Sequence, residues 1–297
     1  MSIQVRQIIP DDIDKVAEIL FVAFARADLA LGHEPTFENV AAARATTRGY
    51  MRADSEGSLL AEEDGEILGC GFLHVRGKTA GIGPVATEPM AQGKGVGRAI
   101  MRQLITIAGP DCSVRLVTGG LNLPAFTLYA SLGFVVREAN IGVAGQLRPG
   151  LSMALDPEEC SFMEPEELER LAKVDAELTG IERPRDLYFF SRVGRIRLAK
   201  EKGQPTGFLA SYRFGRNVIA GPGAAKDLDT MKKLITAVVL DHRDSSISFR
   251  IPGSHPELLH HLRSLGLHIT GVGHYMVHGP WEPARCPRLW PTYPESL

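Results

Sequence analysis

Three glycines at alternate positions, Gly93, Gly95 and Gly97, form the stretch of this chain whose residue types best suit ligand chemistry. Glycine adopts positive φ without steric cost, so such a loop can turn several backbone N–H groups toward one point. The apolar spacing after the loop predicts a helix, whose unpaired first-turn amides and dipole would add positive potential. Lys94 and Arg98 supply flanking positive charge. The pattern predicts a site for a phosphate or pyrophosphate.

Two familiar phosphate-binding motifs do not fit this loop. A Walker loop requires G-x-x-x-x-G-K-S/T, whereas Lys94 lies between glycines and no Ser or Thr follows it. A dinucleotide fingerprint requires G-x-G-x-x-G, a spacing that the three glycines do not have. A glycine-rich turn before a helix can also be purely structural, so that interpretation stays open at this point.

A second group of residues capable of chemistry follows at Asn122 and Tyr129. The apolar spacing predicts a helix over 124–132 that ends at Gly133, a residue suited to the left-handed C-terminal cap. By itself, Tyr129 on this helix suits simple packing. Asn122, two residues before Pro124, suits the N-cap of the helix.

Strands and helices alternate around these residues, as is typical of an α/β chain. A helix with one apolar face follows Pro10-Asp11-Asp12, and residues 28–54 are helical in places. Pro84 interrupts the strand that precedes the glycine-rich loop, and proline within a strand marks a bulge or an unpaired edge. The expected strands of the first half are 3–9, 58–62, 67–75, 80–87, 114–118, 134–138 and 141–147.

Three motifs in the first half resemble those of the GCN5-related N-acetyltransferases, the GNAT family. Residues 92–97 match the family's Q/R-x-x-G-x-G/A loop, and residues 122–134 match its N-x-x-A-x-x-x-Y-x-x-x-G-F pattern. Residues 83–89 look like its fourth strand with the proline that usually follows. The resemblance covers about residues 3–147 and implies an α/β (α+β) fold, in which a mixed, mostly antiparallel central sheet is flanked by helices.

The resemblance implies transfer of an acetyl group from acetyl-coenzyme A to the primary amine of a small molecule, by direct attack on the thioester. The pyrophosphate would lie on the loop, and the pantetheine arm would run along the preceding strand. A backbone N–H freed at the strand interruption could polarise the thioester carbonyl. Tyr129 would protonate the departing thiolate. The residues implied in coenzyme binding are Val85, Ala86, Thr87, Gln92, Gly93, Lys94, Gly95, Val96, Gly97, Arg98, Asn122 and Tyr129.

The general base that must deprotonate the acceptor amine is not identified by any motif. Strand 80–87 carries no acidic residue, although many members of the family have a base on such a strand. His74 and Glu88 are the nearest candidates along the chain. The alternatives are a packed or exposed strand histidine and a carboxylate in a solvated turn. His74 is therefore a candidate contact of the acceptor.

The second half repeats the first with a changing offset. One shift in numbering carries Gly83-Pro84 onto Gly221-Pro222, and a slightly shorter shift carries Gly133 onto Gly266. The stretch lost between these points falls in the glycine-rich loop, where residues 229–233 contain no glycine. The second copy is therefore expected to bind no coenzyme productively.

Three domains are expected: residues 1–150 with the intact loop, a degenerate copy over 151–280, and a Pro- and Trp-rich C-terminal arm over 281–297. In the second copy, His255 replaces Asn122 and Leu262 replaces Tyr129.

Charged residues in the second copy could contribute to an acceptor site. Asp175, Arg183 and Asp186 lie in a stretch that resembles the D-x-x-x-x-G-x-x-R segment of tandem relatives, whose second domain helps form the acceptor pocket. A solvated charged turn is the alternative. His255, His260 and His261 flank a helix start without an H-x-x-x-H or H-E-x-x-H spacing, and four scattered cysteines form no C-x-x-C pair, so no metal is expected.

Composition limits the remaining function classes. A formal net charge of −2 argues against a nucleic-acid binder, and no run approaches the roughly 20 apolar residues that span a bilayer. A cytoplasmic protein, monomeric or homodimeric, is expected. The alternatives to a small-molecule N-acetyltransferase are acetylation of proteins or peptides and a non-catalytic sensor of acyl-coenzyme A.

Overall fold

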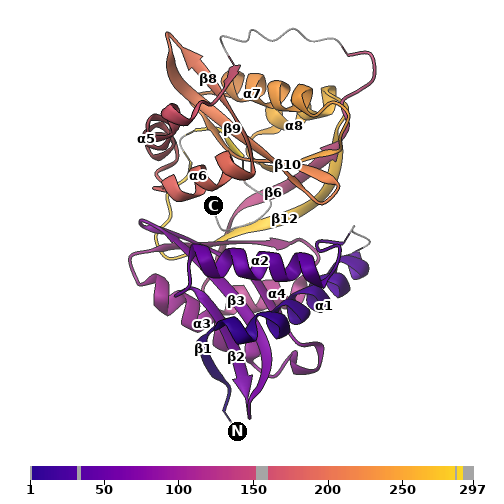
Figure 1. The fold of residues 1–297 in the computed structure, drawn as a ribbon, viewed down its shortest axis with the longest axis vertical. Coiled ribbons are helices and arrows are strands. Elements are labelled where there is room, and N and C mark those ends of the chain that lie inside the picture. The colour runs from indigo at the N-terminus through magenta and orange to yellow at the C-terminus, as the bar shows by residue number, and fades with distance from the viewer. Residues whose placement is uncertain (1, 32–34, 152–159, 285, 290–297) are drawn as a thin grey trace. The chain divides into compact units, whose positions relative to one another are not determined.

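The computed structural model describes residues 2–31, 35–151, 160–284 and 286–289, and it divides into two compact units (Figure 1). Unit 1 comprises residues 1–135 together with 276–281, and unit 2 comprises 136–275 together with the chain from 282 onward. The predicted boundaries at 150 and 280 differ from these limits, because the last strand of each half is built partly or wholly into the other unit. Residues 290–297 of the predicted arm lie outside the described residues.

Unit 1 is a mixed sheet with helices on both faces. Its strands follow the order β1-β2-β3-β4-β5, and every neighbouring pair is antiparallel except β4–β5. β12 follows β5 in the strand order, and its residues from Met276 belong to this unit. The elements are β1 (Gln4–Gln7), α1 (Ile13–Leu31), α2 (Val40–Ala53), β2 (Ser58–Glu63), β3 (Glu66–Arg76), β4 (Thr79–Thr87), α3 (Val96–Ala108), β5 (Ser113–Gly119) and α4 (Leu123–Ser131).

Two apolar clusters hold this sheet between its helices. On one face, Leu20 of α1 and Tyr50 of α2 pack with Phe72 of β3. On the other face, α3 buries Ile100 completely in a cluster that also contains Leu73. The close approach of α3 depends on a glycine, since a Cβ at Gly71 would lie 2.6 Å from the Ile100 side chain.

Unit 2 repeats this plan. Its strands follow the order β12-β6-β11-β10-β9-β8-β7, with the short β13 paired to β10. The elements are β6 (Val135–Gly145), β7 (Cys160–Phe162), α5 (Leu168–Thr179), α6 (Pro184–Val193), β8 (Gly194–Glu201), β9 (Gln204–Phe214), β10 (Asn217–Ala225), α7 (Leu228–Asp241), β11 (Ile247–Pro252), α8 (Pro256–Ser264), β12 (His268–His278) and β13 (Arg288–Leu289).

The bounds of these elements follow the sequence repeat closely. The shift that carries Gly83 onto Gly221 also carries both ends of β3 and β4 onto the ends of β9 and β10. The shorter shift that carries Gly133 onto Gly266 likewise carries α4 onto α8. The two expected strands 134–138 and 141–147 are a single strand, β6, which pairs antiparallel with β11 in unit 2. The predicted fold class is confirmed: each unit has a mixed, mostly antiparallel sheet flanked by helices.

Candidate active site

An opening between two parallel strands is the central feature of unit 1. β4 pairs with β3 along most of its length, but it pairs with β5 only from Thr79 to Gly81. Beyond Gly81, no described strand pairs with the β5-facing edge of β4. The register of β3 against β4 shifts opposite Pro84, which cannot donate to the sheet ladder. Backbone groups along residues 82–87 are therefore available to an extended ligand.

The glycine-rich loop connects this open strand edge to α3. Gly93 has a φ of 79°, and Gly95, the N-cap residue of α3, has a φ of 92°. No side chain caps the helix, and no described group accepts a hydrogen bond from the amides of residues 96–98. These amides and the helix dipole produce an uncompensated positive end.

Positive side chains reinforce the helix N-terminus. Lys94 is exposed on the loop. Arg98 donates to the Ser131 hydroxyl at 3.0 Å, so α4 holds its guanidinium beside the start of α3. No acidic residue occurs from Pro89 to Arg98. The predicted anion-binding residues therefore form one cationic surface of loop and helix.

Tyr129 and Asn122 lie on α4, which packs in the same apolar cluster as α3. Asn122 caps α4, since its side-chain oxygen accepts from the Ala125 amide at 3.3 Å, and its NH₂ group remains a further donor. The Tyr129 ring packs against Phe134, with 6.0 Å between ring centroids. Burial raises the pKa of Tyr129 to about 12, so its hydroxyl is protonated at neutral pH. No described residue hydrogen-bonds that hydroxyl.

The two candidate bases have different surroundings. Glu88 forms an ion pair with Lys15 of α1, with 2.6 Å between Lys15 Nζ and Glu88 Oε1. His74 is 1% exposed and lies opposite Gly81, the last residue of β4 that pairs with β5. His74 is thus positioned where the strand opening begins, whereas the Glu88 carboxylate already has a cationic partner.

Asp54, at the C-terminal end of α2, orients His74. Its Oδ2 lies 2.7 Å from His74 Nδ1, and Arg76 Nη1 lies 3.0 Å from the same carboxylate. Burial raises the pKa of Asp54, but His74 and Arg76 outweigh this effect and hold the pKa below its usual range. In the neutral imidazole, an Nδ1 proton donated to this carboxylate leaves the lone pair on Nε2. That atom is enclosed and has no described hydrogen-bond partner.

Sequence reasoning missed Asp54. It lies 20 residues before His74, in the connection between a helix and a strand, and nothing in its spacing links it to the histidine. Only the packing of α2 against β3 brings the two side chains together.

The predicted acceptor contacts of the second half lie within unit 2 and are bound to each other. Arg183, the N-cap residue of α6, donates to both oxygens of Asp175 on α5 at 2.7 and 2.9 Å. Asp175 is 0% exposed, Arg183 5% and Asp186 8%. These side chains are therefore buried and not part of a solvated turn. Their contact with the acceptor stays a prediction.

The N-terminus of α7 in unit 2 differs from that of α3. Asp227 is its N-cap residue and accepts a hydrogen bond from the Thr230 amide at 2.8 Å. The hydrogen bonds from Thr230 lower the pKa of Asp227, so the carboxylate stays ionised. His255 precedes α8, and Leu262 is fully buried. The positive end of this helix is therefore satisfied by the chain's own carboxylate.

The described residues contain neither a metal-binding cluster nor a membrane-spanning helix. No group of three His, Cys, Asp or Glu side chains there is placed to hold a metal ion. No helix in the same part of the chain is long and apolar enough to cross a membrane. The four cysteines are buried free thiols, and burial raises the pKa of Cys70 to about 12, which makes it unreactive.

Comparison with known proteins identifies the class to which this architecture belongs. Residues 20–134 match the model of the acetyltransferase (GNAT) family, and residues 171–289 match a second acetyltransferase (GNAT) domain model. The chain belongs to the GNAT family and carries two of its domains in tandem. Members of this family transfer acetyl groups from acetyl-coenzyme A to acceptors such as amines.

Individual relatives agree with this assignment. A mycothiol acetyltransferase of Acidothermus cellulolyticus is 37% identical in an alignment of 101 positions, and the match covers 27% of this chain and 30% of that protein. The chain thus matches less than a third of that relative's length.

Solved structures resemble the whole chain in fold. A proposed acetyltransferase from Pyrococcus horikoshii aligns with a TM-score of 0.76 and 18% identity over 99% of this chain and 95% of its own. A GCN5-related N-acetyltransferase from Sphaerobacter thermophilus gives 0.64 and 15%, over 93% and 95% of the two chains. A tandem GNAT protein from the clavulanic acid biosynthesis pathway gives 0.61 and 12%, over 95% and 100%.

Proposed function

We propose that this protein is an N-acetyltransferase whose unit 1 transfers the acetyl group of acetyl-coenzyme A to a primary amine of a small molecule. The observation that carries this proposal is the conjunction, in unit 1 alone, of an open β4 edge and an uncapped α3 N-terminus. The two features match the two ends of the coenzyme, since an extended pantetheine needs a strand edge and a pyrophosphate needs amide donors.

Binding of the coenzyme then uses the residues on which the two features converge. The pyrophosphate accepts hydrogen bonds from amides between Gly93 and Arg98, and Lys94 adds charge. The pantetheine pairs with Val85, Ala86 and Thr87, and the Asn122 amide group donates to it.

Acetyl transfer follows by direct attack. The acceptor nitrogen forms a bond to the thioester carbon, and a backbone amide near the β4 bulge stabilises the developing oxyanion. The C–S bond then breaks, and the protonated Tyr129 hydroxyl donates to the departing sulfur. The nitrogen loses a proton to a base, so that the product is a neutral amide.

His74 is the better of the two candidate bases. An alkylammonium with a pKa of about 10 must lose a proton before it attacks. In the neutral imidazole, Asp54 accepts the Nδ1 proton of His74, and the enclosed Nε2 is then an acceptor without a described donor. Glu88 is neutralised by Lys15 and would lose that ion pair on protonation.

Two observations bear on the acceptor. The partial match to a mycothiol acetyltransferase, named for a small molecule, supports a small-molecule amine. The oriented His74 and protonated Tyr129 favour turnover over the alternative of a sensor, which needs neither a base nor a thiolate acid.

The test is a calorimetric titration with acetyl-coenzyme A, followed by an assay of thiol release against small amines and peptides. We expect one binding site per chain and release that depends on a small amine. Thiol release with peptides but not with small amines would make a peptide the acceptor. Binding of acetyl-coenzyme A without thiol release from any acceptor would favour the sensor. Absence of binding would overturn the proposal.

A further inference from the structure

The end of the described chain forms an additional strand within unit 2. We call residues 282–284 and 286–289 the C-terminal arm. Its β13 pairs antiparallel with β10, with Leu289 opposite Gly223 and Arg288 opposite Ala224. The Ala225 amide donates to the Pro287 carbonyl at 3.0 Å, which extends the pairing by one residue.

The arm lies in a specific slot of the repeated fold. β10 pairs with its parallel neighbour β11 only from Val218 to Ala220, so the two strands separate as β4 and β5 do in unit 1. By the shift that superimposes β4 on β10, Gly223 and Ala224 correspond to Val85 and Ala86. The arm therefore pairs with the strand segment whose counterpart in unit 1 is proposed to pair with pantetheine.

The arm is part of the packed core of unit 2. Leu289 is 2% exposed and belongs to the cluster that contains Met231 and Leu234 of α7. Cys286 belongs to a second cluster with residues of α5 and α6, and its thiol donates to the Leu178 carbonyl. The Arg288 guanidinium lies 5.6 Å from the centre of the Tyr275 ring. The slot thus holds a strand whose side chains complete two apolar clusters.

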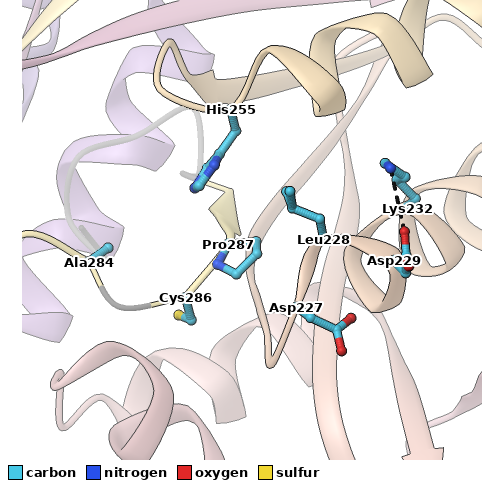
Figure 2. A pocket seen from close by; sticks show the side chains of 8 residues that line it. All are labelled: Asp227, Leu228, Asp229, Lys232, His255, Ala284, Cys286 and Pro287. Carbon is cyan, nitrogen blue, oxygen red and sulfur yellow. Dashed lines mark hydrogen bonds and ion pairs between the residues drawn. The ribbon is translucent and has the colours of Figure 1, made fainter.

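A cavity of about 590 Å³ remains between the arm and the start of α7 (Figure 2). Its floor is the N-terminus of α7, where Asp227 and Asp229 carry negative charge and Lys232 is paired with Asp229. An anionic pyrophosphate would meet these carboxylates there. The lining residues are Asp227, Leu228, Asp229, Lys232, His255, Ala284, Cys286 and Pro287.

We propose that the cleft of unit 2 is a binding groove for an extended peptide, and that the chain's own C-terminal arm is its ligand. The arm replaces the coenzyme in this copy: it satisfies the β10 edge with backbone hydrogen bonds and fills the apolar slot with Leu289. This proposal rests on the proposed function only in identifying the slot as the counterpart of the coenzyme site. The pairing of the arm with β10 does not depend on catalysis in unit 1.

The main experiment removes the arm and returns it as a separate peptide. A chain that ends at Trp281 should unfold at a lower temperature than the full chain. A peptide of residues 282–289 should raise that temperature in a saturable way, and a scrambled peptide should not. Equal unfolding temperatures for the two chains, together with no response to the peptide, would overturn the proposal.

Two substitutions in the full chain keep the proposal testable if the shortened chain does not fold. Leu289→Ala should lower the unfolding temperature by roughly 5–15 °C, because a buried leucine leaves a cavity. Ala284→Ser, at an exposed position of the same arm, is the matched control and should change it by less than about 1 °C. A Leu289→Ala chain that melts like the control would show that the arm does not stabilise the groove.

Acetyl-coenzyme A titration of the same variants separates this proposal from the proposed function. The shortened chain should bind one coenzyme, as the full chain does, because Asp227 still caps α7. Two coenzymes per shortened chain would overturn the assignment of a peptide groove. Absence of coenzyme binding to every chain, with the peptide still bound, would count against the function of unit 1 alone.

Discussion

The N-termini of α3 and α7 occupy the same position in the two units and carry opposite chemistry. α3 begins at an uncapped glycine with a φ of 92°, so its amides are open to an anion. α7 begins with Asp227, whose carboxylate accepts from Thr230 within the same turn. A helix N-terminus that is open to an anion in unit 1 is thus satisfied by the chain's own aspartate in unit 2.

The strand edges beside these helices show the same contrast. The β4 edge from Ile82 to Thr87 lacks a described partner beyond β3, whereas the corresponding β10 edge is paired with β13. The second unit keeps the fold while its own atoms take the places where a ligand would bind. The same fold therefore forms with this strand edge open in one unit and paired within the chain in the other.

The largest difference between the two units is expected when the backbone of the α3 N-terminus is changed. Gly95→Val should reduce acetyl-coenzyme A affinity by at least about 100-fold, because valine resists positive φ and would displace the first-turn amides. Calorimetric titration measures this loss.

Gly109→Val is the matched control, because Gly109 ends the same helix with a φ of 85° and also has open space around its Cα. This variant should lose stability while its affinity stays within about twofold. Equal affinity losses in the two variants would mean that the loop acts only through the stability of α3.

Tyr129→Phe tests the chemical step that unit 1 alone is proposed to perform. Turnover should fall by roughly 10²–10⁴-fold, since the departing thiolate loses its proton donor, while coenzyme affinity stays unchanged. Because the pKa of Tyr129 is raised to about 12, the wild-type rate should show no loss of this acid up to about pH 10. Tyr188→Phe, on the exposed face of α6, should leave turnover unchanged; unchanged turnover in Tyr129→Phe itself would remove the acid role.

His74→Asn should lower turnover at pH 7 by about 10²-fold, the low end of the range for a general base. The loss should shrink as the pH approaches the pKa of the acceptor amine, because the amine then loses its proton to solvent. Asp54→Asn should lower turnover in the same direction. A deficit that is independent of pH would assign His74 a packing role, and a larger deficit in Glu88→Gln would reverse the choice of base.

Asp227→Ala, which removes the cap of α7 in unit 2, should have the smallest effect of these variants. Removal of the cap should destabilise the protein by about 1 kcal/mol, measured by chemical denaturation, without creating a coenzyme site. Folding lowers the pKa of Asp227. The stability that its cap contributes is therefore fully present above the usual pKa of an aspartate and is lost as the pH falls through the pKa of the folded state. The difference between the two proteins should therefore disappear in acid, and a constant difference would contradict the capping role.

Features encoded by short-range residue patterns could be predicted from the sequence. The glycine loop, the helix that ends before Gly133 and the absence of such a loop in the second copy all depend on neighbouring residues and local backbone preference. The unit boundaries could not be predicted, because β6 from Val136 joins unit 2 and residues 276–281 join unit 1. An exchanged strand keeps the same alternating pattern whichever sheet it joins.

The sequence by itself determined the family, the repeat and the residues available for an anion, because each of these depends on residue type and spacing along the chain. Only the tertiary structure decided that Asp54 orients His74, that Asp175 and Arg183 are buried against each other, and that β13 fills the cleft of unit 2. Each of these facts joins residues whose separation in sequence carries no periodic signal. Packing brings them together, because buried charges and open strand edges must find partners wherever the folded chain supplies them.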